Sequence, residues 1–350
     1  MAESKRYGEH TVVFANPPRI LSTANIVGDV EGKGPLGSAF DMVLTDDTWG
    51  ESSYEKAECK MFEQAVRLAL TKVNWDTKML HCLLGGDLLN QIITANYAAR
   101  ELGVPFLGLY GACSTMTESM LLGGMLIDGG FAQRVACAAS SHFSTAERQY
   151  RYPLEMGTTT PPTAQRTVTG AGAVILADEP MQDQQKGPAV FRNIHIESGT
   201  IGKVVDMGIS DAANMGAAMA PAACSTIITH LADLGRAPSY YDAIITGDLG
   251  TFGSEMLHEL CMDEGIDIAS RHLDCGSLIF DTEQQNVNCG GSGCGCSAVV
   301  LSAHLLHFIE KGTWKRILFM ATGALMSPNA TMQGETIPCI AHAVVIERDD

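Results

Sequence analysis

Two stretches of the chain, one in each half, are long enough for helices and carry almost no charge. Between residues 113 and 127 the one charged side chain is Glu118, and residues 294–308 contain none when His304 and His307 are neutral. A helix that is apolar nearly all round is buried on every side. Each stretch is also too short to cross a bilayer, which takes about 20 residues. We therefore expect both helices to lie inside the protein, with a sheet on either side.

The two halves share one order of elements when apolar runs are taken as strands and longer periodic stretches as helices. Both follow the pattern β-α-β-α-β-α-β-β. In the first half the expected strands are 11–16, 79–86, 105–111, 134–141 and 170–177, the helices are 54–73, 89–102 and 114–127, and a long loop follows residue 141. In the second half the expected strands are 192–199, 242–248, a weakly defined one within 275–288, 316–324 and 337–347, and the helices are 215–234, 254–264 and 295–309.

This alternation predicts an α/β fold with mainly parallel sheets covered by helices, and the paired terminal strands add an antiparallel edge to each sheet. With the two uncharged helices between the sheets, the expected architecture is a five-layer αβαβα sandwich. The polar segment at residues 178–188 is the natural boundary between the halves. We therefore expect one half at residues 1–178 and the other at residues 179–350.

Charge and segment composition exclude several classes of function. The chain has 23 Lys and Arg against 40 Asp and Glu, for a formal net charge of -17, which would repel a nucleic-acid backbone. The first residues lack the apolar core of a signal peptide, and no uninterrupted run of about 18 apolar residues predicts a transmembrane segment. We expect an intracellular protein that does not bind nucleic acid.

The eleven cysteines do not suggest a disulfide framework, because most stand singly inside apolar segments. Cys289, Cys294 and Cys296 lie closer together, in NVNCGGSGCGCSAVV. Their spacing fits no common zinc pattern, and their neighbours are mostly glycine and serine. Small residues that pack a tight turn are the favoured interpretation, with a metal site as the alternative.

The duplicated pattern, with a cysteine opening the buried third helix of the first half, resembles the thiolase fold of thiolases and ketoacyl synthases. LGLYGACSTMTESM is similar to the segment that carries the acyl-accepting cysteine of that superfamily. QRTVTGAGAVILA is similar to a strand of its shared core, NVNCGGSGCGCSAVVL lies where the superfamily has a His-Gly or Asn loop, and RILFMATGALMSP lies at its last glycine-rich strand.

A closer resemblance spans the full length. GGDLLNQIITANYAARELGVPFLGLYGACSTMTES and ETIPCIAHAVVIE resemble the stage V sporulation protein AD family of spore-forming bacteria. That resemblance implies a noncatalytic protein that binds dipicolinic acid (pyridine-2,6-dicarboxylate) during its uptake into the developing spore. It further implies a homodimer, other proteins of the stage V sporulation A operon as partners, and a place in the forespore or spore, peripheral to the spore inner membrane. No cofactor is expected, with calcium accompanying dipicolinate as the open alternative.

The residues around Cys113 separate a binding protein from an acyltransferase. A thiol at a helix N-terminus is favoured as a thiolate, so Cys113 is well placed as a nucleophile. Acyl transfer also needs a base and oxyanion donors. Asn288 matches one partner of the superfamily, but Gly247 or Asp248 stands where it has a histidine. We expect Cys113 to be a remnant nucleophile, and the alternative is a ketoacyl-synthase-like acyltransferase in which another side chain replaces that histidine.

The candidate ligand contacts are short polar groups and basic side chains near Cys113. His142 ends a predicted strand on its carboxyl side, where ligands of parallel sheets bind, although a histidine satisfied at a loop edge is equally compatible. Arginines bind carboxylates in a bidentate manner, and backbone amides of helix starts and glycine turns also bind anions. The full set of expected ligand contacts is Cys113, Ser114, His142, Arg148, Arg151, Arg166, Asn288, Gly290 and Gly291. Each arginine taken alone is more typical of a solvated loop charge than of a ligand contact.

Overall fold

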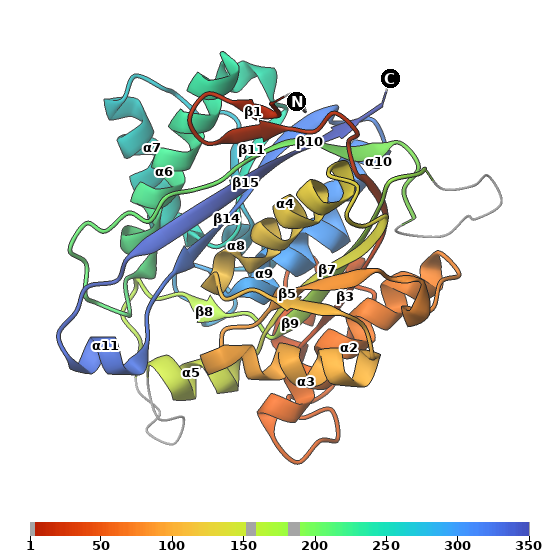
Figure 1. Cartoon of the computed structure of the whole chain (residues 1–350). Coiled ribbons are helices and arrows are strands. Elements are labelled where there is room, and N and C mark those ends of the chain that lie inside the picture. Colours follow the sequence, from red (N-terminus) through yellow and green to blue (C-terminus); the bar gives the residue numbers. More distant parts are fainter. Residues whose placement is uncertain (1–3, 152–158, 181–189, 350) are drawn as a thin grey trace.

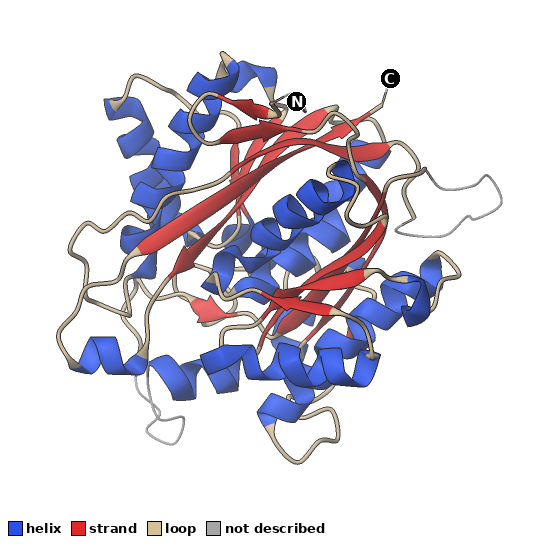
Figure 2. Ribbon diagram, in the orientation of Figure 1, coloured by secondary structure: helices blue, strands red, loops and turns tan. Residues whose placement is uncertain are grey.

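The computed structural model describes residues 4–151, 159–180 and 190–349. Its helices and strands form five layers, with two sheets separated by a pair of central helices and covered by helices outside (Figure 1). Figure 2 shows the two sheets as red strands on either side of the blue central helices. The predicted α/β five-layer sandwich is therefore confirmed.

The two halves build their sheets in the same strand order. The first sheet runs β6 (Phe106–Gly108), β5 (Cys82–Gly86), β7 (Arg134–Ser141), β9 (Gly170–Ala177), β3 (Arg19–Val27). The second runs β12 (His272–Asp274), β11 (Ala243–Thr246), β14 (Arg316–Ala324), β15 (Cys339–Arg348), β10 (Ile194–Thr200). In each sheet the first three strands are parallel to one another. The fourth strand is antiparallel to the third, and the fifth is antiparallel to the fourth. The sheets meet where His195 of β10 pairs with Arg19 of β3.

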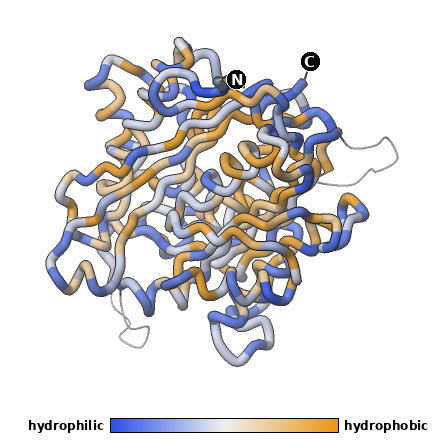
Figure 3. The backbone as a smooth tube through the Cα atoms, viewed as in Figure 1, coloured by the Kyte–Doolittle hydropathy of each residue, from blue (hydrophilic) through white to orange (hydrophobic). Residues whose placement is uncertain are grey.

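The outer helices each cover one sheet. The first sheet packs against α2 (Tyr54–Lys72) and α3 (Ile93–Leu102), and the second against α6 (Met215–Leu234) and α7 (Gly250–Asp263). By length and composition alone α6 could cross a membrane, but 72% of its apolar window is buried in the fold. Figure 3 shows hydrophobic colour along the inner strands and central helices, with hydrophilic colour concentrated in outlying loops.

The central layer contains the two stretches of low charge. These are α4 (Thr115–Asp128) and a helix that begins as α9 (Cys294–Val300), widens into a π-helical turn (Leu301–Leu305) and ends as α10 (Leu306–Glu310). Met116, Met120, Val299 and Val300 belong to one buried cluster with residues of both sheets. Burial between two apolar sheet faces explains why these helices carry so few charged side chains.

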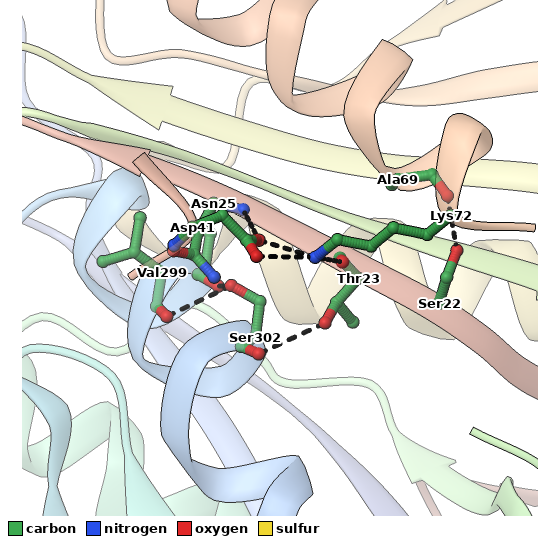
Figure 4. A network of polar contacts seen from close by, with 9 residues as sticks. Ser22, Thr23, Asn25, Asp41, Ala69, Lys72, Val299 and Ser302 are labelled. Carbon is green, nitrogen blue, oxygen red and sulfur yellow. Dashed lines mark hydrogen bonds and ion pairs between the residues drawn. The ribbon is translucent and has the colours of Figure 1, made fainter. Parts of the chain in front are cut away.

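A polar network ties the π-helical turn to the first sheet and to α2 (Figure 4). A π turn interrupts the regular helical ladder. Here the hydroxyl of Thr23 on β3 donates to the carbonyl oxygen of Ser302 at 3.2 Å. On the same strand the carbonyl oxygen of Thr23 accepts from Lys72 Nζ at 2.8 Å, and Lys72 also donates to both carboxylate oxygens of Asp41 at 2.7 Å. The network fixes the central helix against the sheet.

Shorter elements fill the connections. They are β1 (Arg6–Tyr7), β2 (Thr11–Val13), α1 (Asp29–Gly32), β4 (Met42–Val43), α5 (Phe143–Tyr150), β8 (Arg166–Thr167), α8 (Cys275–Ile279), β13 (Gly291–Ser292) and α11 (Pro328–Met332). Five 3-10 turns also occur in the described residues, at Gly37–Ala39, Thr77–Met79, Asn90–Ile92, Ala112–Ser114 and Pro238–Tyr240.

Two sequence-based predictions of elements are wrong, and a third is incomplete. The strand predicted at residues 11–16 is present only as the short β2, and the first core strand, β3, was not predicted. Polar side chains interrupt the apolar pattern of β3, and they are satisfied by bonds such as the one from Ser22 Oγ to the carbonyl oxygen of Ala69. The expected strand within 275–288 is helix α8, capped by Asp274. The loop expected after residue 141 begins with helix α5. Of the predicted boundary segment 178–188, residues 181–188 lie outside the described residues.

Candidate functional site

A cavity of about 340 Å³ opens where Cys113 begins the central layer. Its walls are mainly apolar, and its polar groups come from several different elements. The apolar lining includes Leu88, Ala112, Ala146, Met215, Ala324, Leu325, Met326 and Ala330. The polar lining includes Asn90, Tyr110, Tyr150, Arg151, Thr167, Ser292 and Ser327. A concave, mostly apolar site with a few polar groups is typical of a small-molecule pocket.

The backbone at Cys113 is held in a strained turn. Ala112 has φ 50°, in the left-handed region that costs a non-glycine residue about 1–2 kcal/mol. The 3-10 turn Ala112–Ser114 then runs directly into α4, and the Ser114 hydroxyl donates to the carbonyl oxygen of Gly111 at 2.7 Å. Strain of this kind is often stored at functional sites. The turn presents Cys113 to the cavity, while the Ser114 side chain is directed back into its own turn.

Burial suppresses the reactivity of the Cys113 thiol. It raises the pKa of Cys113 well above the ordinary value of 9.0, and the neighbouring Asp248 and Cys294 raise it further. The backbone N–H of Gly293 opposes this rise. The helix start that favours a thiolate is thus present as predicted, but loss of solvent outweighs it. Cys113 is a neutral thiol at neutral pH.

Asp248 is the neighbour of Cys113 whose charge most affects the thiol. Its side chain is fully buried, and Oδ1 accepts from the Thr322 hydroxyl. Burial raises the pKa of Asp248 to about 7. The hydrogen bond from Thr322 and the nearby Cys113 thiol act in the opposite direction and lower this pKa. The other carboxylate oxygen of Asp248, Oδ2, has no hydrogen-bond partner among the described residues.

Gly247 is closely packed and cannot hold a catalytic side chain. A Cβ there would come within 2.9 Å of Ser297 Cβ and 3.1 Å of Ala321. Of the two positions that the sequence left open, Asp248 is therefore the one beside Cys113. The side chain that accompanies the Cys113 thiol is thus a carboxyl group.

His142 serves as a helix cap. Its Nδ1 accepts from the backbone N–H of Ser144 at 3.1 Å, so Nε2 carries the proton and donates to the carbonyl oxygen of Asp47 at 2.7 Å. Burial also lowers the pKa of His142. Both ring nitrogens are therefore occupied, and His142 lies outside the residues that line the cavity. His142 therefore does not act as a base for the Cys113 thiol in this structure.

The glycine-rich loop reaches the cavity through Ser292 rather than Asn288. The Asn288 amide donates to the Thr160 hydroxyl at 2.6 Å. Gly290 accepts at its carbonyl oxygen from the backbone N–H of Arg166 at 2.8 Å, and Gly291 pairs with Arg166 in the β13–β8 ladder. The Ser292 hydroxyl lines the cavity and has no partner among the described residues. Its position directly after two glycines was the sequence signal that we missed.

The three arginines occupy different places. Arg148 pairs with Glu55 on an exposed face, and Arg166 stacks over the Phe143 ring at 3.9 Å. Arg151 lines the cavity. Its Nη1 donates to the carbonyl oxygen of Gln165 at 2.9 Å and its Nη2 to the Thr167 hydroxyl at 2.7 Å.

Arg151 also forms an ion pair with Glu147 at 2.8 Å. Burial raises the pKa of Glu147 in spite of that pair. The guanidinium is therefore fixed in place by these three contacts.

Two tyrosines at the cavity were not expected from the sequence. The hydroxyl groups of Tyr110 and Tyr150 lie 3.3 Å apart, and Tyr150 also donates to the carbonyl oxygen of Leu88. Tyr110 donates to Asn90 Oδ1 at 3.2 Å. The structure thus brings Cys113 and Arg151 together from the predicted set and adds Asn90, Tyr110, Tyr150 and Ser292.

Cys289, Cys294 and Cys296 are buried free thiols. In the part of the chain that the structure describes, no group of three or more His, Cys, Asp or Glu side chains is arranged to hold a metal ion.

Comparison with known proteins decides the family. Residues 8–347 match the family model of Stage V sporulation protein AD (SpoVAD). The Stage V sporulation protein AD of Bacillus subtilis (strain 168) is 46% identical over 344 residues, which cover 98% of each chain. The chain belongs to the stage V sporulation protein AD family. It is accordingly a member of a sporulation protein family, as the resemblance in the sequence implied.

Solved structures of a 3-oxoacyl-[acyl-carrier-protein] synthase III and of a 3-ketoacyl-CoA thiolase have the same fold as this chain. The 3-oxoacyl-[acyl-carrier-protein] synthase III of Aquifex aeolicus is 14% identical, with a TM-score of 0.55 over 94% of this chain and 99% of that chain. Human mitochondrial 3-ketoacyl-CoA thiolase is 13% identical, with a TM-score of 0.57 over 96% and 100%. At such identities the likeness shows the fold alone.

Proposed function

We propose that this protein binds dipicolinic acid without catalysis, in the cavity beside Cys113, and so supports dipicolinate uptake into the developing spore. The observation that carries the proposal is the pairing of Cys113 with Asp248. The cavity of an acyltransferase fold is retained, but its nucleophile is a buried neutral thiol beside a carboxyl group. The choice of ligand rests on the family resemblance, and the shape and chemistry of the cavity support it.

The cavity suits a small planar acid. Its volume of about 340 Å³ lies near the lower end of ligand pockets. Dipicolinate is rigid, so it loses little internal entropy on binding, and its ring can lie between walls such as Leu88 and Met326. Its carboxylates need hydrogen-bond donors and positive charge. Arg151 supplies charge, and the hydroxyl group of Ser292, which has no partner among the described residues, can donate.

Acyl transfer is the alternative, and the position of Cys113 at a helix start is the observation in its favour. That chemistry needs a base to form the thiolate and donors for the oxyanion. Asp248 repels a thiolate, and the Asn288 amide is bonded to Thr160. Removal of one oxyanion donor alone costs about two to three decades in rate. A binding role therefore accounts for more of the site.

We also propose that two copies associate along β6, the edge strand of the first sheet. An exposed strand edge offers unpaired backbone groups to a second strand. Leu107 on this edge is 50% exposed, and Ile93 and Tyr97 of the adjoining α3 are exposed as well. Association with other proteins of the stage V sporulation A operon and with the spore inner membrane are further proposals that rest on the family resemblance.

Titration calorimetry with dipicolinate and with an acyl-CoA tests the proposed function. The proposal predicts saturable binding of one dipicolinate per chain and no covalent thioester on Cys113 when the acyl-CoA sample is weighed by mass spectrometry. Benzene-1,3-dicarboxylate, which keeps both carboxylates and lacks the ring nitrogen, is the matched control ligand. A stoichiometric thioester followed by turnover would support the acyltransferase instead.

A further inference from the structure

One carboxyl group behind the cavity wall has no counter-charge and an unused oxygen. Asp248 is 0% exposed, and its Oδ2 has no hydrogen-bond partner in the described part of the chain. Its Oδ1 accepts from Thr322, and its backbone carbonyl oxygen accepts from Gln165 Nε2. A buried charged oxygen without a partner is costly, whereas a protonated one becomes a donor. The group is therefore built to take up a proton.

The groups that face Asp248 are acidic or neutral. From β12 it faces Asp274, which accepts from the backbone N–H of Leu249 at 2.8 Å and of Gly250 at 2.9 Å. Thr322 faces it from β14. The thiols that interact with it come from the Ala112–Ser114 turn, α8, α9 and β15, and they are Cys113, Cys275, Cys294, Cys296 and Cys339. The backbone N–H of Gly293 also faces it and favours the ionised form. These surroundings make a second negative charge nearby unfavourable.

We propose that a dicarboxylate occupies the cavity only when Asp248 is protonated, so that ligand binding takes up one proton at Asp248. This inference rests on the proposed function. Cys113 lines the cavity and interacts with Asp248, so a ligand carboxylate beside Cys113 lies near the buried carboxyl group. Like charges repel strongly at such short range in a medium of low dielectric constant. Protonation removes the repulsion and gives Oδ2 a hydrogen to donate toward the thiol.

The sign of the pH dependence follows from the free protein. Burial raises the pKa of Asp248 to about 7, so both protonation states are populated near neutral pH. An anionic ligand prefers the protonated state and raises this pKa further. Affinity should therefore be full below pH 6 and fall as pH rises through about 7, by about tenfold between pH 6 and pH 8.

Titration calorimetry with dipicolinate in buffers of different ionisation enthalpy measures how many protons the protein takes up for each ligand bound. The wild type should take up close to one proton per ligand at pH 8 and close to none at pH 6. Asp248→Asn keeps an acceptor for Thr322 and adds a donor at the position of Oδ2, so it should bind dipicolinate with an affinity that is flat over this range and take up no proton.

Glu31→Gln is the matched control, because burial also raises the pKa of Glu31 to about 7 and its bond from the backbone N–H of Thr169 is kept in the variant. This variant should behave as the wild type does. Glu147, beside Arg151, is the rival proton acceptor.

The outcomes separate this inference from the proposed function. Binding by the wild type without proton uptake at pH 8 would overturn the inference and leave the proposed function standing. Uptake that persists in Asp248→Asn would overturn it too, and would assign the proton to another group such as Glu147. Absence of dipicolinate binding at both pH values would refute the proposed function itself. If Asp248→Asn does not fold, the proton count of the wild type decides.

Discussion

Leu121 of α4 lies directly against Gly199 of β10. A Cβ built on Gly199 would approach Leu121 Cδ1 to 2.3 Å. The helix that belongs to the first half is therefore seated on the sheet of the second half, with Leu121 buried between the layers. Replacement of Leu121 by Asp would bury an unpaired charge there, and we expect a loss of stability on the order of several kcal/mol.

Thermal melts of three variants test this arrangement. Val300→Asp, in the other central helix, should be as damaging as Leu121→Asp, because Val300 is equally buried. Met262→Asp on α7, where the side chain is 54% exposed, is the control and should melt close to the parent. Soluble Leu121→Asp and Val300→Asp proteins with parental melting temperatures would contradict the buried central layer.

The sequence predicts the layers because burial leaves a compositional mark. The absence of charge in the central helices reflects sheets on both sides, and this mark does not depend on detailed geometry. β3 escaped detection for the converse reason: Ser22, Thr23 and Asn25 are polar, and their side chains are satisfied by partners outside the strand, namely Ala69, Ser302 and Asp41. Hydropathy does not show such partners.

The candidate site is predicted less completely. Cys113 is found because a cysteine opening an uncharged helix is unusual. His142 and Asn288 are polar residues at the expected ends of elements, but a helix cap and a loop contact use their hydrogen bonds. Ser292 of β13 and Tyr150 of α5 reach the cavity because segments from both halves fold together there. No local sequence pattern encodes that contact.

The acidity of Glu58 should make stability depend on pH. Burial, and then the neighbouring Asp87, raise its pKa to about 8 from 4.5. Between about pH 4.5 and pH 8 the folded protein keeps a proton on Glu58 that the unfolded chain has already released. The contribution of this proton to the free energy of unfolding is complete below pH 4.5 and is lost as pH rises to about 8. Through Glu58 the free energy of unfolding falls by at most about 1.4 kcal/mol for each pH unit.

Glu58→Gln should flatten the fall of the melting temperature between pH 6.5 and pH 8. Glu101→Gln, at a half-exposed surface position, should leave the slope unchanged. An identical slope in Glu58→Gln and the parent would show that Glu58 is ionised in the folded protein.

The proposed association along β6 predicts a change of mass. Leu107→Asp places a charge on the exposed sheet edge, and we expect this variant to run as a monomer where the parent runs as a dimer in sedimentation at micromolar concentration. Val204→Asp changes a similarly exposed apolar residue away from this edge and should leave the parent's mass unchanged. A dimeric Leu107→Asp protein would place the interface elsewhere.

The most direct test of the binding role fills the cavity at Cys113. The thiol lines the cavity at the end of a fixed turn, so the indole ring of Cys113→Trp should occupy the space that the ligand needs. Cys113→Ala removes the thiol without filling the space, and it should keep dipicolinate affinity within about tenfold of the parent. Thermal melts would first confirm that both variants are folded. Calorimetry should then show no dipicolinate binding by Cys113→Trp, whereas parental affinity in that folded variant would contradict the placement of the ligand beside Cys113.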